Sequence, residues 1–223
     1  MSQEHRMKAD PVTQGVGVIM YDLTPEQLKP IDAAVTQVKE SFGTDKFRPA
    51  NSDLAGHIEK EYYFGDEGLH RHFENIVYPM CMEHVEKYSN SFNQISTITN
   101  DNLPLGLQEV WVNFQSKHEF NPPHIHGGVF SFVLWYDIPY TREQEEQTCP
   151  GFVPDKKSGC FQFLVTNQLG SINAVTLPVD RSWNGRLCLF PASMHHQVFP
   201  FYSTDEYRIT LSGNIALDVK GLK

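Results

Sequence analysis

The sequence predicts an α+β protein that is mainly β, with helices first and short strands after them. Two observations carry this prediction. Apolar residues recur at helical spacing in the first 90 or so residues, whereas from residue 105 onward short segments rich in aromatic and β-branched residues follow one another. Strands in succession without intervening helices are typical of a sandwich or barrel. We expect a single domain over 1–223, in which 1–104 is a helical and strand support and 105–223 is the β core.

The N-terminal part begins with a strand and a helix start. VGVIMYDL is typical of a strand, and Thr24, Pro25 and Gln27 then form a capping pattern. Pro30 predicts an early break, so we expect a short turn first and the true helix start at Pro30. The inward face of that helix is expected to carry Ile31, Ala34, Val35 and Val38.

A second helix is predicted from about Glu67 to Tyr88, with a kink at Pro79. Its inward residues recur at helical spacing and are Leu69, Phe73, Ile76 and Met80. Both helices are most simply a buttress packed on a sheet.

The β core is predicted from seven segments: QEVWVNFQ, VFSFVLWYDI, GCFQFLV, AVTLPV, RLCLF, QVFPF and YRITLSGNI. The dipeptide Asn184-Gly185 predicts a hairpin turn. The long segment 139–159 is acidic and then basic, and we expect a surface excursion there.

Composition and charge narrow the possible functions. The chain is 40% apolar and 20% charged, carries a formal charge of -9, and has no cluster of basic residues, which argues against a nucleic-acid groove. No apolar run is long enough to span a bilayer, and the first twelve residues are too polar for a secretory signal. The four cysteines include no Cys-x-x-Cys pair, so we expect reduced thiols, with a Cys149–Cys160 bridge as an alternative.

Two histidines lie between two prolines and two glycines in FNPPHIHGGVFSFVLWYDIP. Residues two apart on an extended backbone point to the same face, so His124 and His126 project side by side. Imidazole is the commonest metal ligand, and the two rings are close enough to share one ion. The alternative is a polar loop that has this spacing by chance.

A further histidine pair and an arginine follow in LFPASMHHQVFPFYSTDEYRITLSGN. Alternation within YRITLS puts Arg208, Thr210 and Ser212 on one face of a strand. If that face lines a cavity, the guanidinium requires an anionic partner, and its planar fork of donors suits a carboxylate. A surface strand with a solvated polar face is the alternative.

The order His-x-His, about seventy residues, His, twelve residues, Arg-x-Thr resembles the 2-oxoglutarate/Fe(II)-dependent oxygenases. The closest likeness is to the oxygenases common in bacteria and phages that are distantly similar to prolyl hydroxylases. It covers most of the chain and rests on WVN, HIHGGVFSFVLWYDIP, GRLCLFPASMHHQV and YRITLSGN, with ANSDL nearer the N-terminus. The resemblance implies a double-stranded β-helix, or jelly roll, that holds a metal at one open end and is buttressed by N-terminal helices.

The resemblance also implies a set of site residues. His124, His126 and His196 would bind Fe(II), whereas the neighbouring His195 would point the other way. Arg208 would grip the far carboxylate of 2-oxoglutarate, beside the hydroxyl of Thr210. Other contacts to cosubstrate or substrate, with plain packing as an equal alternative, are expected from Asn113, Tyr136 and Asn214. No catalytic side chain beyond the metal ligands is expected.

The chain departs from the wider superfamily at His126, where most members carry Asp or Glu. A neutral ligand replaces an anionic one, so iron with dianionic 2-oxoglutarate would carry one negative charge less. Three imidazoles also suit zinc, nickel and copper. Glu119 is a poor candidate for the missing carboxylate because the rigid Pro122-Pro123 approach separates it from the motif.

The leading functional interpretation is an enzyme that uses Fe(II), 2-oxoglutarate and O2, hydroxylates a C–H bond of an unidentified substrate, and releases succinate and CO2. The alternatives are a cupin-like three-histidine metalloenzyme that does not use 2-oxoglutarate, and a non-catalytic metal-binding protein. We expect a small-molecule or peptide substrate, no nucleic acid and no membrane, and leave a homodimer open. The expected location is the cytoplasm, or the host cytoplasm if the source is viral.

Overall fold

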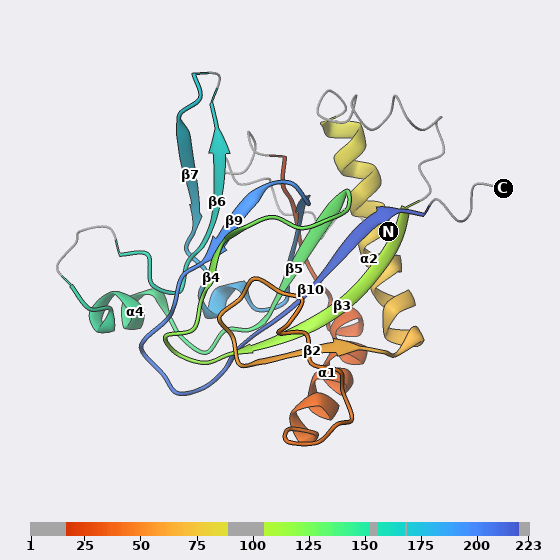
Figure 1. Cartoon of the computed structure of the whole chain (residues 1–223), viewed down its shortest axis with the longest axis horizontal. Helices are drawn as coiled ribbons and strands as arrows, with labels where there is room; N and C mark the ends of the chain where they lie inside the picture. Colours follow the sequence, from red (N-terminus) through yellow and green to blue (C-terminus); the bar gives the residue numbers. More distant parts are fainter. Residues whose placement is uncertain (1–16, 89–104, 152–155, 168, 219–223) are drawn as a thin grey trace.

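The computed structural model describes residues 17–88, 105–151, 156–167 and 169–218. The polar segment of the first twelve residues and parts of both predicted halves of the domain lie outside these ranges. Within them, two antiparallel sheets pack together and three α-helices accompany them. Figure 1 shows α1 and α2 on one side of the larger sheet and the smaller sheet on the other. The described part of the chain is thus mainly β, with a helical buttress contributed by its N-terminal half.

The larger sheet has six strands, which in spatial order are β1 (Ile19–Asp22), β8 (Arg186–Pro191), β5 (Phe130–Asp137), β10 (Arg208–Leu217), β3 (Leu105–Gln115) and β2 (Lys60–Phe64). The smaller sheet has four, which are β4 (Asn121–His124), β9 (His195–Val198), β6 (Phe161–Thr166) and β7 (Ile172–Leu177). All seven predicted strand segments of the core are present. Two further strands were not predicted: β4, because prolines argue against a strand, and β2.

The first helix, α1 (Pro25–Glu40), begins earlier than the sequence predicts. Thr24 and Gln27 form a complete capping box, and the helix continues through Pro30 without a break. The expected helix start at Pro30 is therefore wrong. A proline here costs the hydrogen bond to the carbonyl of Glu26, but Pro30 is exposed, so that carbonyl can bond to water instead. The buried face of the helix is as predicted and carries Ile31, Val35 and Val38.

The second helix, α2 (Glu67–Lys87), begins at the predicted residue and ends one residue before the predicted Tyr88. It continues through Pro79, and the kink expected there stays a prediction. Asp66 caps it by accepting a hydrogen bond from the backbone N–H of Leu69 at 2.6 Å. All four residues predicted to point inward are buried, together with Val77, Cys81 and His84.

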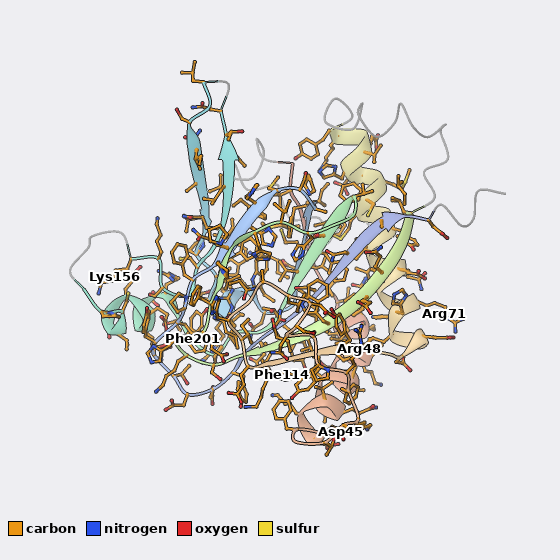
Figure 2. All side chains as sticks on the ribbon, viewed as in Figure 1. Asp45, Arg48, Arg71, Phe114, Lys156 and Phe201 are labelled. Carbon is orange, nitrogen blue, oxygen red and sulfur yellow. The ribbon has the colours of Figure 1, made fainter. Side chains whose placement is uncertain are left out.

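Two apolar clusters occupy the two faces of the larger sheet. One lies between the sheet and helices α1 and α2, and contains Phe73, Phe132 and Leu211. The other lies between the two sheets and contains Trp135, Phe161 and Phe190. Figure 2 shows side chains filling both layers, with Arg71 and Asp45 at the outer edge of the helical side. Alternation along each central strand thus sends one set of side chains to the helices and the other set between the sheets.

The dipeptide Asn184-Gly185 does not make the predicted hairpin. It ends a 3-10 turn (Arg181–Trp183) at the point where the chain crosses from the smaller sheet into the larger one. Asn184 has φ -57°, whereas the expected type I′ turn needs positive φ at both positions; only Gly185 has it, at 85°. The side-chain oxygen of Asn184 instead accepts a hydrogen bond from the backbone N–H of Ile138 at 2.8 Å.

The segment 139–159 is partly structured. It contains the short helix α4 (Arg142–Thr148), and one of its residues, Glu145, is fully buried, so it is more than a surface excursion. Residues 152–155 of this segment lie outside the described ranges. All four cysteines are free thiols, as expected, and the alternative Cys149–Cys160 bridge is absent. No helix among the described residues combines the length and apolar character needed to cross a membrane.

Candidate metal and carboxylate site

Three histidines meet at the edge where β4 and β9 pair. His124 is the last residue of β4 and stands directly opposite His196 of β9 in the antiparallel register. His126 follows two residues later, and its backbone N–H donates to the carbonyl of Ala192 at 2.9 Å. One ring nitrogen from each histidine lies within 4.8 Å of the others, a spacing that one metal ion can bridge.

The hydrogen bonds of two histidines define which ring nitrogen is free. The Nδ1 atom of His124 lies 2.7 Å from the carbonyl of Pro122, and Nδ1 of His196 lies 2.9 Å from the carbonyl of Met194. A carbonyl oxygen can only accept, so each Nδ1 carries the proton and each Nε2 keeps its lone pair. Metal-binding histidines have this arrangement, in which the outer N–H is held by a carbonyl.

Burial keeps these imidazoles neutral. It lowers the pKa of His126 to about 4 and that of His196 to about 3, with a further contribution from the neighbouring His124. The pKa of His124 is lowered for the same reason. Neutral rings are the form that binds a metal, so at neutral pH no proton has to be displaced.

The neighbouring candidates for ligands are excluded by their positions. His195 is exposed and does not join the cluster, as predicted for a residue pointing the other way. The carboxylate of Glu119 accepts hydrogen bonds from the backbone N–H of Ser116 at 2.6 Å and of Glu59 at 3.0 Å. Among the described residues, therefore, no carboxylate completes the histidine cluster.

Arg208 lies in the same cavity as the three histidines and is 1% exposed. Its Nη1 donates to the carbonyl of Gly159 at 3.0 Å. Its Nε and Nη2 have no hydrogen-bond partner among the described residues, and no ion pair within those residues involves this guanidinium. Leaving a buried guanidinium half satisfied is costly, and the natural complement is a carboxylate that takes both free donors.

Gly159 allows the arginine to be held in this way. Its φ is 69°, and a Cβ atom at this position would lie 2.7 Å from the ring of Tyr140. The hydroxyl of Tyr140 also donates to the Gly159 carbonyl, at 3.0 Å. Only glycine lets this carbonyl receive both donors, and this orients the arginine side chain.

The other predicted contacts are divided between the cavity and its surroundings. Asn113 and Thr210 are opposite each other on β3 and β10, line the cavity, and are joined by a 3.1 Å hydrogen bond from Asn113 Nδ2. Asn214 does not line it: its Oδ1 accepts from the hydroxyl of Ser131 at 2.7 Å.

Tyr136 is not brought to the cavity either. It lies on the other face of β5, where it packs with the helix-side cluster, and its hydroxyl bonds to Asp32 of α1. The expectation of a cosubstrate contact is wrong for this residue. Neighbouring residues on a strand point to opposite faces, so the side chain of Trp135 lines the cavity and that of Tyr136 points to the helices.

The cavity also contains polar residues that sequence reasoning missed, chiefly Glu61 and Asn121. Glu61 is 1% exposed, and neither of its carboxylate oxygens has a hydrogen-bond partner among the described residues. Burial, with a smaller contribution from Glu119, raises the pKa of Glu61 to about 7. The period-two alternation of KEYYF, which faces Glu61 and Tyr63 to one side, is the pattern that would have found this strand.

The residues present fit a divalent metal that also binds an anion. His124, His126 and His196 would hold the ion through one ring nitrogen each, and no other described His, Cys, Asp or Glu joins this group. The free donors of Arg208 lie in that same cavity, where an anion bound to the metal could reach them.

Comparison with known proteins agrees with this site. Residues 109–214 match the model of a family described as "Putative 2OG-Fe(II) oxygenase", and this span contains the three histidines and Arg208. A comparison with curated proteins returned no match. The resemblance predicted from the sequence is thereby confirmed. The family consists of enzymes, and its cofactors are the predicted Fe(II) and 2-oxoglutarate.

Solved structures show the same fold. A prolyl-4-hydroxylase from Pseudomonas putida is similar at 16% identity with a TM-score of 0.51, covering 92% of this chain and 95% of that one. An oxidoreductase of the 2OG-Fe(II) oxygenase family from Burkholderia pseudomallei is similar at 12% identity and 0.50, covering 95% and 93%. The epimerase SnoN, solved with Fe3+, alpha-ketoglutarate and nogalamycin RO, is similar at 14% identity and 0.51, covering 93% and 84%. The predicted jelly-roll class is therefore confirmed.

Proposed function

We propose that this chain, whose core matches the 2OG-Fe(II) oxygenases, hydroxylates a C–H bond of a small-molecule or peptide substrate. The balanced reaction joins one substrate C–H, one O2 and one 2-oxoglutarate, and yields the alcohol, succinate and CO2. When bound, Fe(II) would activate O2, which is the oxidant, and 2-oxoglutarate would supply two of the four electrons that reduce it. The remaining tasks belong to the protein.

The proposed ligands are His124, His126 and His196. Their neutral rings bring no charge to the site, so a divalent ion with dianionic 2-oxoglutarate would be neutral, and the buried Arg208 would leave the site with one positive charge. A site with two histidines and a carboxylate beside the same arginine would carry no net charge. The three-histidine set therefore differs from that site by one unit of charge.

Arg208 is the proposed clamp for the far carboxylate of 2-oxoglutarate. Its Nε and Nη2 are two parallel donors, which is the geometry of a bidentate pair. Thr210, two residues along the same strand face, is placed to add a hydroxyl. The walls of this part of the cavity include Trp135, Phe161 and Phe190, which exclude water around the reacting groups.

One observation carries the proposal: a buried arginine with two free donors shares a cavity with three neutral histidines. A structural arginine would use its donors within the protein, and a cosubstrate-free metalloenzyme would have no need of it. The cupin-like alternative has only the three-histidine set in its favour, and that set is equally consistent with the oxygenase.

The test combines binding and turnover. Protein reconstituted with Fe(II) under nitrogen is titrated calorimetrically with 2-oxoglutarate, then exposed to O2 while succinate is measured. We expect saturable binding and slow succinate formation even without substrate. The alternative outcome, metal binding with no saturable 2-oxoglutarate binding, would overturn the proposal in favour of the cupin-like or binding-only interpretation.

A further inference from the structure

Among the described residues, the buried side-chain atoms of the cavity that lack a hydrogen-bond partner fall into two groups, donors on one side and acceptors on the other. On the β5 and β10 side they are all donors: Nε and Nη2 of Arg208 and Nε1 of Trp135. On the β2, β3 and β4 side they are all acceptors: both oxygens of Glu61 and the Oδ1 atoms of Asn113 and Asn121. The donor side suits an anion, and the acceptor side suits a group that carries several N–H bonds.

The strand register places these two sides across the sheet from each other. Trp135 and Asn113 both pair with Thr210 of β10, and Asn113 in turn pairs with Glu61. Strands are about 4.8 Å apart, so the backbone of Glu61 lies about 10 Å across the sheet from that of Thr210. Glu61 and Arg208 thus come from strands that are separated by β3, and no ion pair joins the two side chains.

Two of the acceptors converge on one small space. A Cβ atom at Gly56 would lie 2.6 Å from Oδ1 of Asn121 and 3.2 Å from Oε1 of Glu61. Gly56 belongs to the segment 50–58, which forms one wall of the cavity through Leu54, Ala55 and Ile58. That segment is held in place by Asn51, whose Nδ2 donates to the carbonyls of Ile58 at 2.6 Å and Glu59 at 2.9 Å.

A negative charge lies near Glu61. Within the described part of the chain, Glu119 adds to the raised pKa of Glu61, and backbone N–H groups hold the Glu119 carboxylate in place. No Lys or Arg of the described residues forms an ion pair with Glu61. A buried carboxylate is normally paired with a cation, and the described residues supply none to Glu61. We therefore expect a ligand to supply that cation.

We propose that Glu61 and Asn121 form a substrate-binding site for a cationic nitrogen group, an ammonium or a guanidinium. The inference deepens the proposed function, on which it rests, by giving the oxygenase a basic substrate. A cation fits better than a neutral hydroxyl because it offers several donors at once and ionises Glu61 to its charged form. A free amine and the side chain of a basic peptide residue share this chemistry.

The probes are matched pairs that differ in charge. Protein loaded with Zn(II) and 2-oxoglutarate under nitrogen is titrated with n-butylammonium and with n-butanol, and binding is followed by saturation-transfer NMR. A second pair, Nα-acetyl-lysine amide and Nα-acetyl-norleucine amide, keeps the lysine side chain charged. It distinguishes a site for a peptide side chain from a site for a free amine. We expect each cation to bind at least ~10-fold more tightly than its neutral partner, which is about 1.4 kcal/mol.

Two variants and one control locate the effect. Glu61→Gln should remove the preference for the cation, and Gly56→Ala should weaken binding of the cation by filling the space beside the acceptors. Glu59→Gln is the control: Glu59 is exposed and directly follows the segment 50–58, so this change should leave cation binding unaltered. Thermal melting without probe distinguishes a binding role from a structural role. If Glu61 serves a ligand and has no partner in the free protein, Glu61→Gln should have an equal or higher Tm than the wild type at pH 8.

Failure of this inference differs from failure of the proposed function. Equal binding of cation and neutral probe, or a cation preference that survives Glu61→Gln, overturns the inference whether or not 2-oxoglutarate binds. A Tm that falls in Glu61→Gln with cation binding unchanged also overturns it, because Glu61 would then be structural. A cation preference that depends on Glu61 in metal-loaded protein that does not bind 2-oxoglutarate would support the cation site and reject the oxygenase.

Discussion

Two glutamates of the described residues are almost completely buried, and their surroundings are opposite. Glu145 of α4 accepts hydrogen bonds from the backbone N–H groups of Tyr202 and Ser203 and from the hydroxyl of Ser203, at 2.5–3.2 Å. Glu61 of β2 has no such partner. The first carboxylate joins α4 to the loop that follows β9, whereas the second faces a cavity.

The difference separates polar groups that build the fold from groups that serve a ligand. A buried charge must be compensated, and Glu145 receives its compensation from the protein. Glu61 and Arg208 do not, although each is only 1% exposed. Replacing a residue of the first kind should therefore lower stability and leave ligand binding unchanged. Replacing a residue of the second kind should weaken ligand binding without lowering the stability of the ligand-free protein. Four experiments test this distinction.

The largest effect is expected from His196→Ala. Removing one of three proposed ligands should weaken divalent metal binding by at least ~1000-fold, or about 4 kcal/mol. His195→Ala is the matched control, because His195 is the exposed neighbour and should change affinity by less than about threefold. Metal affinity is measured by competition with a chromophoric chelator. Equal losses in the two variants would reject the proposed ligand set.

Glu145→Ala should come next and act on stability alone. It leaves two backbone N–H groups without an acceptor inside the protein and opens a small cavity, so we expect a loss of about 3 kcal/mol in the free energy of unfolding. Urea denaturation measures this loss. Metal affinity of the folded variant should equal that of the wild type. A neutral effect on unfolding would mean that the bonds to Tyr202 and Ser203 contribute little.

Arg208→Lys should act on the cosubstrate. Lysine keeps the charge but not the planar pair of donors, so 2-oxoglutarate should bind about 30-fold more weakly, or about 2 kcal/mol. Anaerobic calorimetry of Zn(II)-loaded protein measures this change, and metal affinity should stay within about twofold of the wild type. If the lysine variant bound 2-oxoglutarate as well as the wild type, Arg208 would not be a bidentate clamp.

The smallest effect concerns pH. The pKa of Glu61 in the folded protein is about 7, above its ordinary value of 4.5, so the folded state holds this proton more tightly than the unfolded state does. Stability from this group is therefore lost as pH rises from 4.5 through 7. The shift corresponds to about 3 kcal/mol at most. The cost of burying the glutamine amide is the same at every pH, so it does not alter the pH dependence. Glu61→Gln should therefore gain about 2 kcal/mol relative to wild type between pH 5 and pH 8.

The histidines act in the opposite direction. The folded pKa values of His126 and His196, about 4 and about 3, lie below the ordinary 6.5. The unfolded state therefore takes up protons first, and metal-free protein should lose stability as pH falls below 6.5. This contribution is common to wild type and Glu61→Gln, so the difference between their melting curves isolates the glutamate. A difference that does not change with pH would mean that Glu61 keeps its ordinary pKa.

Sequence alone determined whatever depends on local spacing. The inward faces of α1 and α2, the seven core strands, the pairing of His124 with His126, and the shared face of Arg208 and Thr210 all follow from periods of 3.6 or 2 along the chain. His196 and Arg208 were assigned by the order of motifs, because no local pattern connects them with residues seventy positions away.

Tertiary structure decided which polar groups are compensated and which are left for a ligand. Pro30 stays helical because its side of α1 is exposed, and Tyr136 misses the cavity because its face of β5 belongs to the helices. Glu61 and Glu145 cannot be told apart from the chain, since each is a glutamate among ordinary neighbours. The hydrogen-bond partners of Glu145 come from residues that are far away in the sequence and that only folding brings close. Folding brings no such partner to Glu61 among the described residues.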